Sequence, residues 1–156
     1  MVAAKRLLFG RVAIDLLPGP SELLVMADDT ADPAFVAADL LAQAEHGSGH
    51  ERIWCVSASA KLLSKVNEQI TKQLNPLNRR EFIQRTLEAN GWLVLVKNLN
   101  DAISLANQIA PEHCEIMVKG GRRIAEQIRT AGAIFIGPLT VFFTASPPQW
   151  NWVLLP

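Results

Sequence analysis

The chain has 156 residues, of which 49% are hydrophobic and 19% are charged, so it can fold as one ordinary domain and is not a disordered chain. Its net charge of zero and its pI of about 6.8 give no overall electrostatic preference for nucleic acid or for a membrane surface. No apolar run approaches the roughly 20 residues of a membrane-spanning helix, and two cysteines are too few for a secreted disulfide scaffold. We therefore expect a cytoplasmic globular protein that has neither nucleic acid nor a membrane as its partner.

Short apolar runs alternate with segments of helical period, which predicts an α/β protein. In chain order the pattern predicts strands at residues 11–14 and 23–27, a helix at 33–45, a strand at 52–57, helices at 58–74 and 79–90, a strand at 92–96, a helix at 101–109, a strand at 115–118, a helix at 121–130 and a strand at 133–136. This order predicts a Rossmann-like fold, in which a mostly parallel sheet carries helices on both faces.

The expected helix ends rest on capping residues. Asp32 is the expected N-cap of the helix that follows it, with Pro33 at the first helical position. Asn100 or Asp101 is expected to cap the helix at residues 101–109, and Gly91 to close the helix at residues 79–90.

The character of the chain changes near its end. We divide the sequence into an α/β domain at residues 1–138 and a divergent apolar tail at residues 139–156. The tail has no charged residue, and its aromatic side chains are Phe142, Phe143, Trp150 and Trp152. A segment of this composition either packs against a partner or promotes aggregation.

Gln43 and His46 are the first candidate metal ligands. A spacing of three places both side chains on one face of a helix, where an amide oxygen and an imidazole could reach one metal ion. Zinc accepts imidazole readily, although an amide oxygen is an unusual ligand for it. The simpler interpretation is a helix C-terminus with a histidine near the negative end of the helix dipole.

Glu112 and His113 are the candidate acid–base pair. They follow Pro111 in a loop that leads into a strand at one edge of the sheet. A carboxylate and an imidazole with different pKa ranges can divide the roles of general acid and general base. Read from chemistry alone, most such dipeptides are surface loop residues, and that interpretation stays open.

The remaining polar and sulfur-containing side chains are expected to be structural or solvated. His50 is expected in solvent, Cys55 in the core, and Cys114 in a structural role. The basic loop at residues 119–123 could bind a phosphate at a helix N-terminus, although a solvated cap is the stronger interpretation. There is no Gly-x-Gly-x-x-Gly element, so the cofactor-binding residues stay unknown.

The segments at residues 15–25, 31–46, 110–116 and 131–138 together resemble histidinol dehydrogenase. They include the Pro-Gly-Pro-Ser-Glu turn at residues 18–22, the Gln-Ala-Glu-His run at 43–46 and the Ala-Pro-Glu-His run at 110–113. The resemblance covers residues 12–138 and implies an NAD-dependent oxidoreductase that uses zinc and takes L-histidinol to L-histidine in two steps. Members of the family are homodimers of subunits more than twice this length, so the chain is similar to part of one Rossmann-like domain.

The resemblance also implies roles for five residues. Gln43 and His46 match two of the four zinc ligands, and through the metal they take part in binding the substrate. Ser21 matches a residue that contacts the substrate. His113 matches the substrate-binding general base, and Glu112 matches the residue that activates water for the second oxidation.

Three departures from the family limit this interpretation. Family members continue with a Gly-Asp-aromatic loop whose aspartate is the third zinc ligand, whereas residues 140–156 contain neither Asp nor Glu. The fourth ligand, a histidine supplied by the dimer partner, has no counterpart here, and neither do most of the NAD contacts. The motif stops abruptly at Leu139, from which we hypothesise a frameshift or a truncated reading frame.

We therefore expect a fragment of the enzyme that is inactive alone and that needs a homodimer partner or a complementing chain. A non-catalytic binding module derived from the family is the alternative, and an enzyme that acts on another small alcohol is a third reading.

Overall fold

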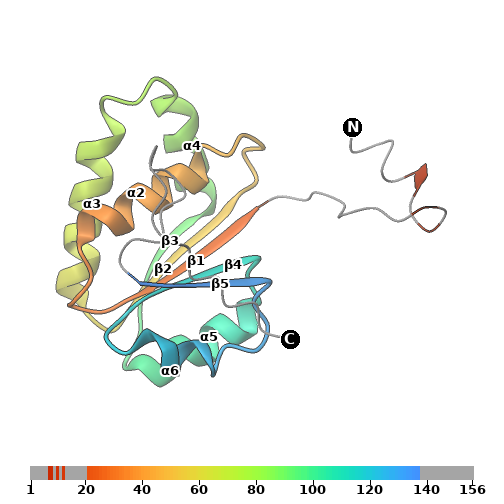
Figure 1. Ribbon diagram of the computed structural model, residues 1–156. Helices are drawn as coiled ribbons and strands as arrows, with labels where there is room; N and C mark the ends of the chain where they lie inside the picture. The colour runs from red at the N-terminus through yellow and green to blue at the C-terminus, as the bar shows by residue number, and fades with distance from the viewer. Residues whose placement is uncertain (1–6, 9, 11, 13–20, 138–156) are drawn as a thin grey trace.

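The computed structural model describes residues 7, 8, 10, 12 and 21–137. Its centre is a five-stranded sheet in the order β3-β2-β1-β4-β5, in which every pair of neighbouring strands is parallel (Figure 1). The strands are β1 (Glu22–Ala27), β2 (Arg52–Ser57), β3 (Gly91–Leu95), β4 (His113–Met117) and β5 (Ala133–Ile136). The predicted α/β, Rossmann-like class is confirmed.

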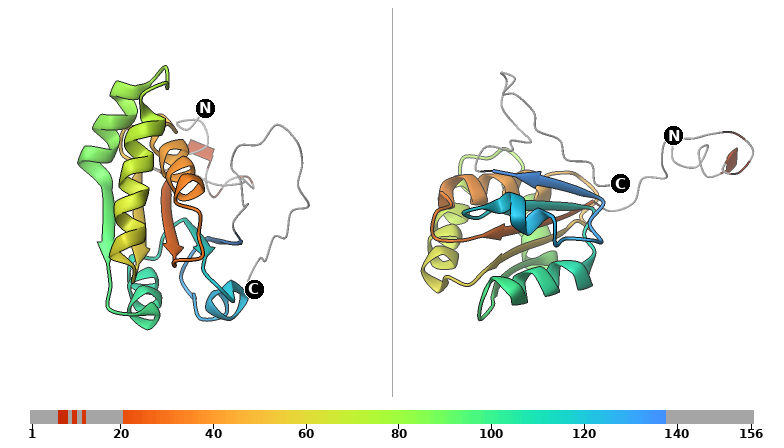
Figure 2. Two further views of the ribbon diagram at one scale, coloured as in Figure 1. Left: turned by 90° about the vertical axis from the view of Figure 1, so that its left-hand side faces the viewer. Right: turned by 60° about the horizontal axis from the view of Figure 1, so that its bottom comes forward.

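Helices cover both faces of this sheet. The first layer consists of α2 (Pro33–Ala44), α3 (Ala60–Leu74) and α4 (Arg80–Asn90), and the second of α5 (Leu99–Ile109) and α6 (Gly121–Ala125). Figure 2 shows the sheet between the two layers. Side chains of a strand alternate between the two faces, so Leu23 and Val25 join the core under the first layer, while Leu24 and Met26 join the core under the second. No helix in the described part of the chain is long and apolar enough to span a bilayer.

Short polar side chains fix the helix starts. The Asp32 carboxylate accepts the N–H of Ala34 at 2.8 Å, which confirms the predicted cap of α2. Ser59 caps α3, which therefore begins two residues later than expected. Asn98, rather than Asn100 or Asp101, caps α5 because its side chain accepts the N–H of Asp101 at 3.1 Å.

Gly91 ends α4 as predicted, and it also begins β3. Its φ of −110° is extended, so the reason for glycine is space: an added Cβ would lie 2.6 Å from the carbonyl oxygen of Leu87.

Strand β4 differs most from expectation. It begins at His113 rather than at residue 115, because parallel pairing with β1 already includes His113 opposite Leu23. It is also flanked by β1 and β5, so it does not lie at an edge of the sheet. The helix expected at 121–130 ends at Ala125. The strand expected at 11–14, apart from Val12, and the tail at 139–156 lie outside the described residues.

Candidate functional site

The candidate residues come together at the amino ends of the strands. Because all strands are parallel, the residues that precede β1 and β4 are neighbours, as the pairing of Leu23 with His113 requires. Helix α2, which follows β1, runs back across the sheet, so its last turn lies beside the amino ends of the strands. Ser21, Gln43, Glu112 and His113 therefore lie together beside the amino ends of the strands, although up to 92 residues separate them in sequence.

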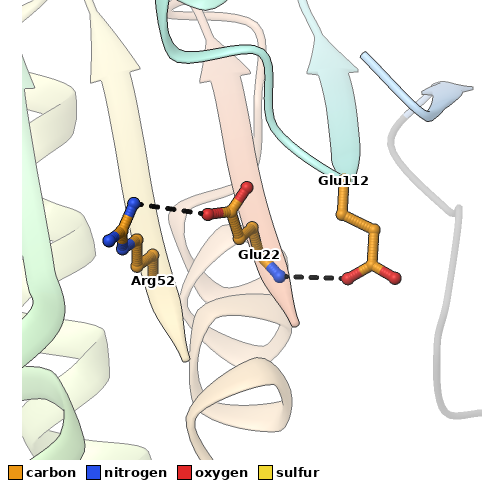
Figure 3. Close-up of polar contacts among 3 residues, drawn as sticks. All are labelled: Glu22, Arg52 and Glu112. Carbon is orange, nitrogen blue, oxygen red and sulfur yellow. Dashed lines mark hydrogen bonds and ion pairs between the residues drawn. The ribbon is translucent and has the colours of Figure 1, made fainter. Parts of the chain in front are cut away.

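Glu112 is held by backbone rather than left free in solvent. Its Oε2 atom accepts the N–H of Glu22 at 3.2 Å (Figure 3). The Nδ1 atom of His113 lies 3.7 Å from the same oxygen. Arg52 in turn lies 3.6 Å from the carboxylate of Glu22, so three neighbouring strands contribute to this cluster. The arrangement gives a carboxylate of fixed direction beside an imidazole, which suits proton transfer.

The imidazole of His113 is partly enclosed. Its side chain is 22% exposed, against 48% for Glu112, and its ring centre lies 5.8 Å from that of Phe135 on β5. A freely solvated loop histidine would have neither property. The structure therefore places His113 as an anchored side chain at the start of a strand.

Ser21 and Gln43 are buried polar residues at the same ends of the strands. Ser21 is 6% exposed, and its carbonyl oxygen accepts the N–H of Arg52 at 3.2 Å. Gln43 is 7% exposed, and its Nε2 atom has no hydrogen-bond partner among the described residues. A buried amide without a partner is costly and calls for an explanation such as a ligand. The nitrogen and oxygen atoms of a side-chain amide are assigned from its hydrogen-bond partners, and the two can be exchanged by a rotation of the amide group. The Gln43 oxygen could therefore equally occupy this position and bind a metal.

His46 lies beyond the helix rather than on it. Helix α2 ends at Ala44 with Glu45 as its C-cap, and the N–H of His46 donates to the carbonyl oxygen of Gln43 at 3.2 Å. The expected shared helix face is therefore wrong in its geometry, because a turn joins the two residues. The His46 side chain is exposed.

The donors present fit one part of a zinc site. Gln43 offers a buried amide without a partner, and His46 offers an accessible imidazole, whereas zinc in proteins takes about four ligands or three and a water. No group of three His, Cys, Asp or Glu side chains that could hold a metal exists within the described ranges.

The other predicted side chains take structural places. Cys55 and Cys114 are free and buried as expected, and burial raises the pKa of each thiol to about 12. His50 is exposed, as expected. The N–H of Lys119 donates to the Asp28 carboxylate at 2.9 Å, which ties the basic loop to the end of β1.

Two buried carboxyl groups were not predicted. Asp39 on α2 is 9% exposed, Glu115 on β4 is 1% exposed, and their side chains are hydrogen bonded to each other. Burial raises the pKa of Asp39 to about 7, partly offset by this hydrogen bond. The signal was present in the sequence, because each acidic residue interrupts a run that is otherwise apolar: Ala37 to Leu41 on the helix and Cys114 to Met117 on the strand.

A third unpredicted carboxylate, Glu51, organises the loop after α2. Glu51 is fully buried, and its Oε1 atom accepts the N–H of Ser48 at 2.7 Å. Although burial acts to raise the pKa of Glu51, hydrogen bonds from Ser48 and Gly49 bring it below its ordinary value. The carboxylate thus holds in shape the loop between His46 and β2.

An open parallel sheet between two helix layers, with a carboxylate, an imidazole, a hydroxyl and an amide at the amino ends of its strands, defines a domain of the α/β, Rossmann-like class. Within that class the chain belongs to the histidinol dehydrogenase family, because the family model described as histidinol dehydrogenase matches residues 1–145.

Individual relatives agree with the family match. The chain is 47% identical over 140 residues to the histidinol dehydrogenase of Bradyrhizobium diazoefficiens, covering 90% of this chain and 32% of that protein. It is 44% identical over 153 residues to the enzyme of Aquifex aeolicus, covering 98% and 34%. A crystal structure of histidinol dehydrogenase from Elizabethkingia anophelis superposes with a TM-score of 0.81 at 34% identity, covering 88% of this chain and 32% of that one. The chain thus spans about a third of the length of these relatives.

Proposed function

We propose that this chain supplies the proton-transfer centre and two zinc ligands of a histidinol dehydrogenase, which oxidises L-histidinol to L-histidine in histidine biosynthesis. One observation carries the proposal. Separate segments of the chain bring Ser21, Gln43, Glu112 and His113 together at the amino ends of the strands. The identity of the substrate in this proposal comes from membership of the family.

Two residues of the chain would each accept a proton in one of the two oxidations. The imidazole of His113 would accept the proton of the substrate hydroxyl in the first oxidation, and Glu112 would take a proton from the water that adds to the aldehyde before the second. Ser21 would contact the substrate. When bound, zinc held by Gln43 and His46 would position the substrate, and NAD would accept a hydride in each oxidation.

The same proposal makes the isolated chain inactive. Two protein ligands leave a zinc site incomplete, and the loss of one member of a catalytic group usually lowers turnover by orders of magnitude. The remaining ligands and the NAD contacts would come from a homodimer partner or a complementing chain. The two free, buried cysteines are in keeping with a cytosolic location.

A second candidate function is a non-catalytic interaction module. Strand β3 is the last strand of the sheet on its side, and it exposes 43% of Trp92, 39% of Leu93 and 57% of Leu95. Exposed apolar edge strands tend to pair with other chains. This function would need no acid–base pair, so the two candidates differ in what happens when Glu112 or His113 is replaced.

The test replaces the segment of the Bradyrhizobium enzyme that matches residues 12–138 with those residues of this chain, keeps the enzyme's own sequence after that point, and measures NADH formation from histidinol. We expect the chimera to be active and His113→Asn to lower its turnover by roughly 10²–10⁴-fold. The exposed Glu126→Gln is the matched control and should leave turnover unchanged. A folded, zinc-loaded chimera without turnover would favour the interaction module, and NADH formation by the purified 156-residue chain alone would contradict the predicted incompleteness.

A further inference from the structure

The buried carboxyl pair lies directly behind the candidate site. Asp39 and Glu115 come from α2 and β4, the two elements whose ends carry Gln43 and His113. Two carboxylates that are hydrogen bonded in a buried place cannot both be ionised, because like charges at that distance repel strongly. One of the two therefore keeps a proton and donates it to the other.

The position of this pair fixes a register between helix and strand. Asp39 and Gln43 are four residues apart on α2 and share a face, which corresponds to about 6 Å along the helix. Glu115 and His113 are two residues apart on β4 and share a face, which corresponds to about 6.6 Å along the strand. Because α2 runs antiparallel to β4, a bond between Asp39 and Glu115 brings Gln43 to the level of His113.

Other contacts of α2 restrain it in a different direction. The side chain of Gln73 on α3 donates to the carbonyl oxygen of Ala34 at 2.9 Å, and Arg79 donates to the carbonyl oxygen of Glu45 at 2.9 Å. Both bonds tie α2 to its neighbouring helices rather than to the sheet. Apolar packing of the helix on the sheet is not directional, so the carboxyl pair is the directional contact that relates α2 to β4.

We propose that Asp39 and Glu115 share one proton and act as a positioning pair, whose hydrogen bond holds Gln43 at the level of His113. Its relevance to catalysis rests on the proposed function, because Gln43 and His113 belong to that site. Neither carboxyl group is assigned to touch the substrate. Their role is to hold in place the residues that do.

Few other titratable groups face the pair. On β4 itself, His113 lies two residues away on the same face, and Cys55 of β2 belongs to the core on that side of the sheet. The residues paired with Glu115 on β1 and β5 are Val25 and Phe135, which do not titrate.

The experiment uses the full chain, without zinc, NAD or histidinol, and observes the proton directly. Infrared spectra at about pH 6 should show the carbonyl stretch of one protonated carboxyl group, since ordinary Asp and Glu side chains are ionised there. Asp39→Asn and Glu115→Gln should each abolish this band, whereas the exposed Glu68→Gln should keep it.

The positioning role is read from the nuclear magnetic resonance signals of the Gln43 amide and the His113 ring. Asp39→Asn retains a hydrogen-bond donor toward Glu115 and should keep both sets of signals near their original positions, whereas Asp39→Ala should shift or broaden them. If Asp39→Ala does not fold, raising the pH of the unsubstituted chain to about 9 tests the same point, because loss of the band and movement of the Gln43 signals should share one midpoint.

Two outcomes would overturn the proposal. One is the absence of a protonated carboxyl group at about pH 6. The other is that the Gln43 and His113 signals stay unchanged in a folded Asp39→Ala chain, or while the band of the unsubstituted chain is lost as the pH rises. Both readouts are independent of turnover, so an inactive chimera would count against the proposed function and leave this inference standing.

Discussion

Replacing Gly132 with alanine should destabilise the chain and displace the Glu112 carbonyl group. Gly132 precedes β5, where its N–H donates to the carbonyl oxygen of Pro111 at 3.1 Å, and the next N–H, from Ala133, donates to that of Glu112 at 2.8 Å. A Cβ at Gly132 would lie 2.9 Å from the Glu112 oxygen, about 0.5 Å short of the 3.4 Å at which ordinary contact begins. The obstacle is backbone, so a rotamer change cannot relieve it.

The magnitude follows from this contact. Forcing a group into a packed place costs about 1–3 kcal/mol, which lowers the melting temperature of a chain of this size by roughly 2–4 °C per kcal/mol. Where no contact interferes, a change from glycine to alanine stabilises by about 0.4–1 kcal/mol through the unfolded state. The sign of the effect is therefore diagnostic.

Urea unfolding followed by circular dichroism measures this free energy. The exposed Ser64→Ala on α3 is the control and should stay within about 0.5 kcal/mol of the unsubstituted chain. Hydrogen exchange at the Glu22 amide, which donates to the Glu112 carboxylate, should be faster in Gly132→Ala. An unfolding free energy equal to or above that of the unsubstituted chain would refute the reasoning.

Three further predictions concern the core and its titratable groups. Because burial raises the pKa of Asp39 to about 7 from an ordinary 3.8, its contribution to stability is complete below the ordinary value and is lost as the pH rises through about 7. Between pH 5 and pH 8 the free energy of unfolding should therefore fall by at most roughly 3 kcal/mol, a loss that Asp39→Asn removes, and an unchanged pH dependence in that variant would contradict the assignment. Ile83 on α4 is fully buried, so Ile83→Ala should lower the unfolding free energy by about 2–5 kcal/mol, and a loss under 1 kcal/mol in urea unfolding would mean that α4 packs loosely. Cys55 and Cys114 should stay unreactive toward a thiol reagent at pH 8 until the chain unfolds, because burial raises the pKa of each thiol to about 12; rapid labelling of either thiol in the native chain would refute their burial.

Much of the fold is readable from the sequence because the apolar runs are short and the caps are local. Asp32 with Pro33 marks the start of α2, and the parallel sheet follows from the alternation of strands and helices. The prediction of an element's start is wrong where pairing with a strand distant in sequence sets that start. The start of β4 at His113 is set by pairing with β1, which lies 90 residues earlier in the chain, and no local pattern contains that information.

Some contacts of the candidate site could be predicted from the sequence, and others could not. That Ser21 and Glu112 meet could be inferred once the strands are known to be parallel, since both precede strands. The partnership of Asp39 with Glu115 could not be inferred, because it depends on how α2 is rotated on the sheet. An acidic residue within each of two buried runs signals that a partner exists without saying which one.

The bond between the Glu22 amide and the Glu112 carboxylate joins residues 90 positions apart, and this separation has a consequence for synthesis. A ribosome makes α2 long before β4, and at roughly 5–20 residues per second it needs several seconds to pass from Gln43 to His113. During that time Asp39 and Gln43 face no strand β4, and one side of β1 has no neighbour. The nascent chain thus passes through a stage with an open sheet edge and unpaired polar groups, which is the stage at which a chaperone would matter most.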